Sequence, residues 1–538
     1  MSSNLIRGTF ILTLGTFLSK FLGLFYVIPF YSIIGKEGTA LYTYGYVPYT
    51  IAISVATAGV PLAVSKFVSK YNALEEYEMG QRIFRSGISL MLITGVISFL
   101  LLFALAPVFA DIIIPEDEGF LSSRSDVIGV IRAVSFALIL VPILSLIRGF
   151  FQGHESMGPS AVSQVVEQIV RIVFLLAASY AVINIFNGEL STAVNFATFA
   201  AFIGAIGGLA VLGWYWIKRR SHMNTLFSKS KGQIHMTTWE MYKELLTYAG
   251  PFVLVGIANP LYQFIDQLTF NNAMVEAGIE KEQAETILGI LNFSTHKLIL
   301  IPVTLAIALS LTLVPVITKT FVQQNFHSLH NQLTQTFQIL LFLTIPACVG
   351  LLVLAEPMYT LFYENLSEGT HILAIYAPVA ILFALFSVTA AILQGVDEQR
   401  YTLLSLLVGL LIKLSLNIPL IHWLQADGSI LATALGYSAA ILINLFVIKR
   451  TANFQFGKVF RMSLLILILT AFMALAVFST SYIMEIFFEP VSKIQALMIV
   501  LPSVFMGLLA YGLISLKLGL VAKLFPSQYQ RLKAKLLG

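Results

Sequence analysis

The stretch ILGILNFSTHKLILIPVTLAIALSLTLVPVITKT, residues 287–320, decides the class of this protein. It is apolar and long enough to cross a bilayer, which requires about 20 mostly apolar residues. It nevertheless contains His296 and Lys297 well inside, together with Pro302 and Pro315. A charge in such a helix costs roughly 2.5–3.5 kcal/mol on insertion scales, and proline frees backbone groups that neighbours must satisfy. The pattern therefore predicts a membrane helix in which Lys297 faces a water-filled cavity and meets an anionic substrate.

The composition extends this interpretation to the whole chain. Of its 538 residues, 58% are hydrophobic and only 11% are charged, whereas soluble proteins carry about 25% charged residues. We expect an integral membrane protein without a soluble domain, because the two longest polar stretches, 218–243 and the end of the chain after residue 517, are too short for one. The single cysteine, Cys348, excludes disulfides and cysteine metal clusters within the chain.

Enzyme signatures are missing from the sequence, which has no Walker A loop, no HExxH and no GxSxG pattern. We therefore expect no enzymatic activity, no cofactor and no metal, and nothing in the sequence points to nucleic acid. Any energy coupling must use ion gradients, the membrane potential or substrate gradients.

Apolar stretches of sufficient length predict an all-α bundle of fourteen transmembrane helices joined by short connections. Their approximate ranges are 8–34, 41–68, 83–110, 127–151, 159–185, 193–217, 245–270, 286–318, 334–355, 370–394, 401–424, 428–448, 459–484 and 494–517.

Lysine and arginine in the loops predict the orientation of these helices. With both termini in the cytoplasm, most of the loop lysines and arginines lie inside. The outer loops then hold Lys36, Arg124, Lys281 and Lys493, and they collect acidic residues that include Asp111, Glu116, Asp117, Glu118, Asp126, Glu276, Glu280, Glu282 and Glu285.

An internal repeat relates the two halves of the chain. Gln152-Gly153 and Gln394-Gly395 each end a predicted helix, and Arg171 follows the first pair by the interval at which Lys413 follows the second. Six spans separate the copies, so the halves share one orientation and a pseudo-two-fold axis along the membrane normal, as in transporters that rock two lobes around a midplane site. The predicted parts are an N-lobe (1–220), a basic cytoplasmic linker (221–244), a C-lobe (245–450), two extra helices (451–520) and a basic cytoplasmic tail (521–538).

Charged residues within the predicted spans are mostly basic. The basic ones are Lys20, Arg132, Arg148, Arg171, Lys297 and Lys413, against the acidic Glu167 and Asp266. A cationic interior suits a phosphate or pyrophosphate group. A carboxylate-rich interior would instead favour a drug or cation exporter.

Each of these residues also has a structural interpretation. Arg171 lies four residues after Glu167, so the two can pair on one helical face. Arg132 and Arg148 lie near the ends of their helix and can extend to the headgroups. Lys413 lies near mid-span and faces either a cavity or a peripheral helix interface.

The strongest substrate-binding candidates are Lys20 and Lys297. Lys20 lies mid-span, too far from either interface to reach it, and we expect it to face the cavity. Asp266 lies at the depth of Lys297 and either pairs with it or takes a coupling cation. His296 is either a polar wall of the cavity or a proton carrier.

Two short stretches resemble a known family. The fourteen-helix plan resembles the MOP exporter superfamily, which includes MATE exporters and polysaccharide flippases. The stretch GTFLSKFLG (15–23) resembles the first-helix pattern of the MurJ and stage V sporulation protein B group, and Lys20 occupies its basic position. The stretch KLILIP (297–302) is similar to the eighth-helix motif of that group, in which Lys297 matches an essential arginine.

The chain also departs from the Gram-negative pattern of that group. His296 stands where those members have an aspartate, and Tyr26 stands where they have a second first-helix arginine. Ile53 falls near the position of their second-helix arginine. These departures fit the Gram-positive branch better.

The resemblance implies a flippase in a bacterial plasma membrane that moves lipid II, the undecaprenyl-pyrophosphate-linked peptidoglycan precursor, from the inner to the outer leaflet by alternating access. Lys20 and Lys297 would hold the pyrophosphate in the central cavity. Further cavity or coupling residues would be Asp266, His296, Lys413, Arg171 and Tyr26. The expected partners are the lipid-linked substrate, membrane lipids and the cell-wall synthesis machinery, with the protein acting as a monomer. The alternatives are a flippase for another undecaprenyl-pyrophosphate-linked polysaccharide unit, a MATE-type drug or cation antiporter, and a non-transporting scaffold.

Overall fold

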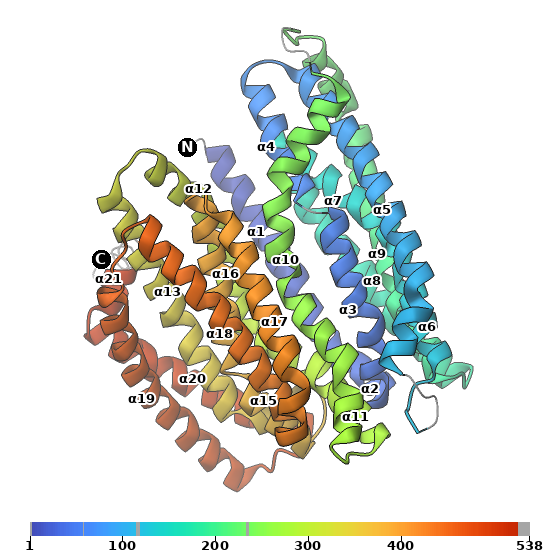
Figure 1. The fold of residues 1–538 in the computed structure, drawn as a ribbon, viewed down its shortest axis with the longest axis vertical. Coiled ribbons are helices and arrows are strands. Elements are labelled where there is room, and N and C mark those ends of the chain that lie inside the picture. Colours follow the sequence, from blue (N-terminus) through green and yellow to red (C-terminus); the bar gives the residue numbers. More distant parts are fainter. Residues whose placement is uncertain (1–2, 58, 115–118, 233–235, 526–538) are drawn as a thin grey trace. The chain divides into compact units, whose positions relative to one another are not determined.

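The computed structural model describes residues 3–57, 59–114, 119–232 and 236–525 (Figure 1). The regular elements in these ranges are all helical, which confirms the predicted fold class. Residues 526–538 of the predicted basic tail and the acidic residues 116–118 lie outside the described residues. The chain divides into two compact units, of which the first holds residues 1–271 and 280–289 and the second holds 272–279 and 290–538.

The first unit contains the helices of the N-terminal half and most of α10. They are α1 (Ser3–Phe25), α2 (Val27–Ile34), α3 (Glu37–Thr57), α4 (Val60–Ala73), α5 (Tyr77–Ile113), α6 (Arg124–Ser135), α7 (Ala137–Gly153), α8 (Met157–Tyr180), the π-helix η1 (Ala181–Ile185), α9 (Leu190–Phe227), α10 (Thr238–Glu276) and α11 (Lys281–Gly289).

The second unit contains the remaining helices. They are the π-helix η2 (Ile290–Thr295), α12 (His296–Val322), α13 (Phe326–Val353), α14 (Ala355–Phe362), α15 (Ser367–Tyr376), α16 (Val379–Gly395), α17 (Gln399–Leu424), α18 (Ala426–Thr451), α19 (Gly457–Phe487), α20 (Lys493–Lys517) and α21 (Leu520–Leu524).

Helix length and hydropathy identify thirteen candidate membrane spans among the described residues. They correspond to all of the predicted segments except 245–270. That segment lies within α10, a continuous helix of 39 residues, which is about 58 Å long at 1.5 Å per residue. The fourteen-helix plan therefore agrees with the structure. The boundaries of the predicted lobes, linker and tail stay a prediction.

The second predicted segment is broken in the middle by the sequence Gly59-Val60-Pro61. Gly59 has φ of 70°, in the left-handed region that favours glycine, and α4 begins at Val60 with the proline in its first turn. Helix α7 approaches this break closely, because a Cβ atom on Gly149 would collide with the backbone carbonyl of Pro61. The break and the glycine contact together fix how α4 packs on α7.

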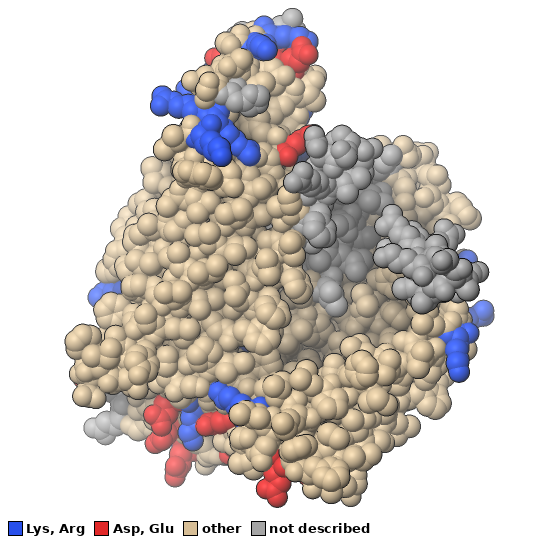
Figure 2. Space-filling view, turned by 180° about the vertical axis from the view of Figure 1, so that it is seen from behind, with Lys and Arg blue, Asp and Glu red and all other residues tan. Residues whose placement is uncertain are grey.

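The predicted linker 221–244 is helical over much of its length. Helix α9 runs on to Phe227 and α10 already begins at Thr238. Span prediction misses these extensions because it measures apolar length, whereas lysine, arginine and glutamate are good helix formers outside the membrane. Lysine and arginine side chains gather at this end of the first unit (Figure 2).

The turn between α4 and α5 is tied to the loop that follows α9. Lys231 pairs with Glu75 at 2.8 Å, and the backbone N–H of Gly232 donates to the buried carboxylate of Glu76 at 3.0 Å. The Lys231 ammonium lowers the pKa of the Glu75 carboxyl, and Glu75 in turn raises the pKa of Lys231.

We expect this attachment to depend on pH at both extremes. The lowered pKa of Glu75 means that its contribution is complete above its unfolded pKa, near 4.3, and is lost as the pH falls through the folded value. The raised pKa of Lys231 means that its contribution to the attachment is complete below its unfolded pKa, about 10.4. That contribution is lost as the pH rises through the folded value. Amide hydrogen exchange of residues 229–232 should be slow at neutral pH and faster in Glu75→Gln. Equal exchange in both proteins would contradict this role.

Candidate functional site

Lys20 lies on α1, which packs against α8 through small residues. A Cβ atom on Gly15 would meet Ala161, and the hydroxyl of Thr16 donates to Gln164 at 2.9 Å. Lys20 flanks this packed face and its side chain is exposed on the first unit. The prediction that Lys20 faces the central cavity stays a prediction.

Lys297 lies one residue inside α12, directly after the π-helix η2. The extra residue per turn of a π-helix changes the direction of the side chains that follow, and such segments are frequent at functional sites. The hydroxyl of Thr295 donates to the carbonyls of Ile290 and Leu291 at 3.0 and 2.9 Å. The Lys297 ammonium lies 3.5 Å from the centroid of the Phe293 ring, so this cation is held over an aromatic face and is only half-buried.

His296 points into the interior of the second unit. It is buried, its Nδ1 lies 3.2 Å from the hydroxyl of Tyr376, and its ring packs beside Tyr376 and Phe383. These contacts place it between α12, α15 and α16. The two interpretations of His296, a polar wall of the cavity or a proton carrier, stay predictions.

Arg171 contacts tyrosines rather than the carboxylate that the sequence suggests. Its guanidinium donates to the hydroxyl of Tyr42 at 3.4 Å and lies 5.3 Å from the centroid of the Tyr46 ring. Tyr42 is also hydrogen-bonded to Tyr26. We call Arg171, Tyr26, Tyr42 and Tyr46 the arginine–tyrosine cluster. It brings two of the predicted residues, Arg171 and Tyr26, together within the first unit.

The carboxylate of Glu167 belongs to a different arginine. Arg148 on α7 donates to it at 2.6 Å and to the hydroxyl of Ser163 at 2.7 Å. The predicted pair of Glu167 with Arg171 is therefore wrong, and so is the prediction that Arg148 extends to the headgroups. Both errors have one cause: spacing along α8 does not show that α7 supplies a closer cation.

Lys413 lies in the interface between α17 and α18. Its side chain is fully buried, and its ammonium donates to the hydroxyl of Thr433 at 2.7 Å and to the carbonyl of Ser429 at 3.1 Å. Of the two sequence interpretations, the helix interface is the correct one. The repeat-related Arg171 has a different environment, among tyrosines.

Asp266 is buried on α10. The next residue, Gln267, donates to the backbone carbonyl of Thr43, and Asn271 donates to the hydroxyl of Tyr44 at 2.8 Å. This part of α10 is therefore anchored on α3 in the first unit. The proposed pairing of Asp266 with Lys297, and its alternative role as a cation ligand, stay predictions.

Two features of the site were missed at the level of sequence. The stretch YTYGYVPY (42–49) places four tyrosines within one membrane helix, and this run was the signal for the arginine–tyrosine cluster. Glu285 is fully buried and accepts hydrogen bonds from the backbone N–H groups of Leu121 and Ser122 at 2.8 and 3.1 Å. These hydrogen bonds connect α11 to the loop before α6. The position of Glu285 in the sequence does not predict them.

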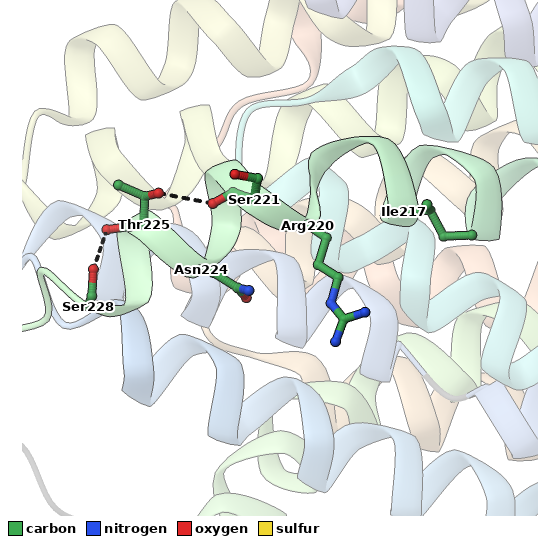
Figure 3. A pocket seen from close by; sticks show the side chains of 6 residues that line it. All are labelled: Ile217, Arg220, Ser221, Asn224, Thr225 and Ser228. Carbon is green, nitrogen blue, oxygen red and sulfur yellow. Dashed lines mark hydrogen bonds between the residues drawn. The ribbon is translucent and has the colours of Figure 1, made fainter.

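A hollow of about 630 Å³ runs along the outer side of α9 and is lined by Ile217, Arg220, Ser221, Asn224, Thr225 and Ser228 (Figure 3). The hydroxyls of Thr225 and Ser228 donate to carbonyls of their own helix at 3.0 Å. Five of the lining residues lie on α9 and the sixth, Ser228, directly follows it, so the hollow is a surface groove at the basic end of the first unit. We assign no site to it.

Comparison with known proteins gives consistent results. The family model described as polysaccharide biosynthesis protein matches residues 5–321, and the MatE model matches residues 288–419. The lipid II flippase MurJ of Bacillus subtilis (strain 168) is 47% identical over 529 residues, which cover 97% of each chain. Stage V sporulation protein B of the same organism is 23% identical over 479 residues, 88% of this chain and 89% of that protein.

Solved structures show the same fold. The lipid II flippase MurJ in an inward closed conformation matches with a TM-score of 0.60 at 16% identity, covering 95% of this chain and 99% of that one. An outward-facing multidrug resistance MATE transporter of the MOP superfamily matches with a TM-score of 0.59 at 15% identity, covering 84% and 96%. On the basis of the family model and the 47% identical relative, this chain is a multi-pass membrane protein that belongs to the polysaccharide biosynthesis protein family and, within it, to the lipid II flippase MurJ group.

Proposed function

We propose that this protein moves lipid II from the inner to the outer leaflet of the plasma membrane by alternating access, with both termini in the cytoplasm. The observation that carries the proposal is the 47% identity with the lipid II flippase MurJ of Bacillus subtilis over 97% of both chains. At that identity and coverage, the substrate of the relative is the best supported substrate of this chain.

In this proposal Lys20 and Lys297 are the cations that bind the pyrophosphate of the substrate. Lys20 is exposed, and Lys297 is half-buried with its ammonium over Phe293. A phosphate oxygen accepts a charge-assisted hydrogen bond from an ammonium, which is about twice as strong as a neutral one. Arg171 of the arginine–tyrosine cluster is the third cation of this proposal. The phenol hydroxyls of the cluster can also donate hydrogen bonds to the glycan.

The direct test is an assay of externally accessible lipid II after acute depletion of this protein, in cells that lack other flippases. We expect lipid II to accumulate inside and its labelled outer fraction to fall, and re-expression to restore it. Undiminished outer lipid II after complete depletion would refute the proposed substrate.

A second candidate is transport of another undecaprenyl-pyrophosphate-linked glycan, which the polysaccharide biosynthesis model over residues 5–321 favours. The depletion assay separates the two, because that candidate predicts internal accumulation of a different lipid-linked glycan while lipid II export continues.

A further inference from the structure

A second cationic site lies in the second unit, away from every residue assigned above. A hollow of about 660 Å³ lies where the beginning of α13, the beginning of α19 and the short helix α21 meet. It is lined by Asn331, Thr334, Gln335, Gln338, Lys458, Arg461, Met462, Leu465 and Lys523. We call it the α13–α19–α21 pocket.

Three cations line this pocket, and no acidic residue does. Lys458 and Arg461 come from the first turns of α19 and Lys523 comes from α21. Within the described part of the chain, none of the three makes an ion pair or a side-chain hydrogen bond. Like charges gathered at one hollow repel each other, so the arrangement is more favourable when an anion occupies it.

The walls of the pocket are tied together by side-chain amides of α13. Gln335 donates to the backbone carbonyl of Leu524 at 3.1 Å, and Gln338 donates to that of Lys458 at 3.4 Å. These two bonds fix α21 and the start of α19 on α13. The cations therefore lie on two elements, α19 and α21, that α13 holds in place, rather than on one free helix face.

The pocket also has an apolar side, which favours an anion that carries a hydrocarbon chain. Met462 and Leu465 line it, and the face of α19 that carries Arg461 and Leu465 continues with Ile468, Phe472 and Leu475. These positions follow Arg461 by 4, 7, 11 and 14 residues, the spacing of one helical face. Ile468, Phe472 and Leu475 are 55%, 55% and 62% exposed, and the face extends about 21 Å from Arg461.

We propose that the α13–α19–α21 pocket binds the phosphate-bearing headgroup of a membrane lipid, with the hydrocarbon chain lying along this face of α19. A soluble phosphate would use the cations but not the apolar wall or the face beyond it. Two lipids share the required chemistry, an anionic phospholipid of the bilayer and a lipid-linked pyrophosphate. The site does not depend on which glycan the protein transports.

The test is lipid retention by the purified full-length protein in detergent, measured by native mass spectrometry with phosphatidylglycerol. The test variant is Lys458→Gln/Arg461→Gln, and the matched control is Lys449→Gln/Arg450→Gln, which removes the same charges from the end of α18. We expect the test variant to lose roughly tenfold or more in phosphatidylglycerol affinity, since each basic residue near an anionic surface contributes several-fold. The control should bind as the wild type does.

Four further measurements complete the test. Lys458→Arg/Arg461→Lys, which keeps the charges, should bind as the wild type does, and thermal unfolding should show that all variants are folded. Undecaprenyl pyrophosphate that displaces phosphatidylglycerol assigns the pocket to the lipid-linked substrate, and failure to displace it assigns the pocket to bulk phospholipid. Equal binding by the wild type and the glutamine variant, or displacement of the lipid by inorganic phosphate alone at millimolar concentration, would overturn the proposal.

Discussion

Lys297→Ala is expected to reduce export of lipid II at least tenfold, the largest functional effect that we predict. Each hydrogen bond from a charged donor contributes about 1.5–3 kcal/mol, and alanine removes the whole ammonium that α12 holds over Phe293. Lys20→Ala should have an effect of the same kind in the first unit. The measurement is externally accessible lipid II in cells whose only flippase is the variant.

Two controls accompany this experiment. Lys297→Arg should retain most activity, because it keeps a cation and its donors at the same place. Lys517→Ala removes an exposed lysine at the end of α20 and should leave export unchanged. Wild-type export by both Lys20→Ala and Lys297→Ala, at normal protein levels, would show that neither lysine holds the substrate.

Arg148→Ala is expected to cause the largest loss of stability, about 3 kcal/mol in the free energy of unfolding. The Arg148 and Glu167 side chains are only 13% and 23% exposed, and removing one partner of a mostly buried ion pair leaves the other charge uncompensated. Denaturant unfolding of the purified protein in detergent measures the loss.

The matched control for Arg148 is Arg124→Ala. Arg124 also pairs with a carboxylate, that of Asp111, but these side chains are 40% and 52% exposed. Exposed pairs contribute about 0–1 kcal/mol, so this variant should differ little from the wild type. The double variant Arg148→Met/Glu167→Gln should recover much of the stability lost in Arg148→Ala. An equal loss in the two single alanine variants would contradict the importance of burial.

The fold was predictable from sequence because each membrane helix must satisfy its own backbone, so apolar length alone marks it. The break at Gly59-Val60-Pro61 lies inside the predicted span 41–68, because apolar length does not show where a helix is interrupted. The pairing of charges was not predictable either. Glu167 has one arginine four residues away on its own helix and another on α7, and the packing of α7 on α8 decides between them.

For the candidate site, the sequence predicts which residue types lie within the membrane spans better than it predicts where their side chains point. Lys20 is exposed and Lys297 is half-buried, and their role in binding the substrate stays a prediction. His296 and Lys413 are buried instead, because the sequence shows the depth of a residue in the membrane but not the direction of its side chain. The contacts between Arg171 and the tyrosines were not predicted, because aromatic residues are common in membrane helices and their presence alone does not indicate a site.

The buried lysine of α17 also bears on how the protein enters the membrane. Ser429 and Thr433, which accept hydrogen bonds from Lys413, both lie on α18, and only Gln425, with φ of 54°, separates the two helices. If α17 entered the hydrocarbon alone, it would carry an unsatisfied ammonium at a cost of roughly 2.5–3.5 kcal/mol. Insertion of α17 and α18 as one hairpin avoids that cost, so the lysine couples the biogenesis of the two helices.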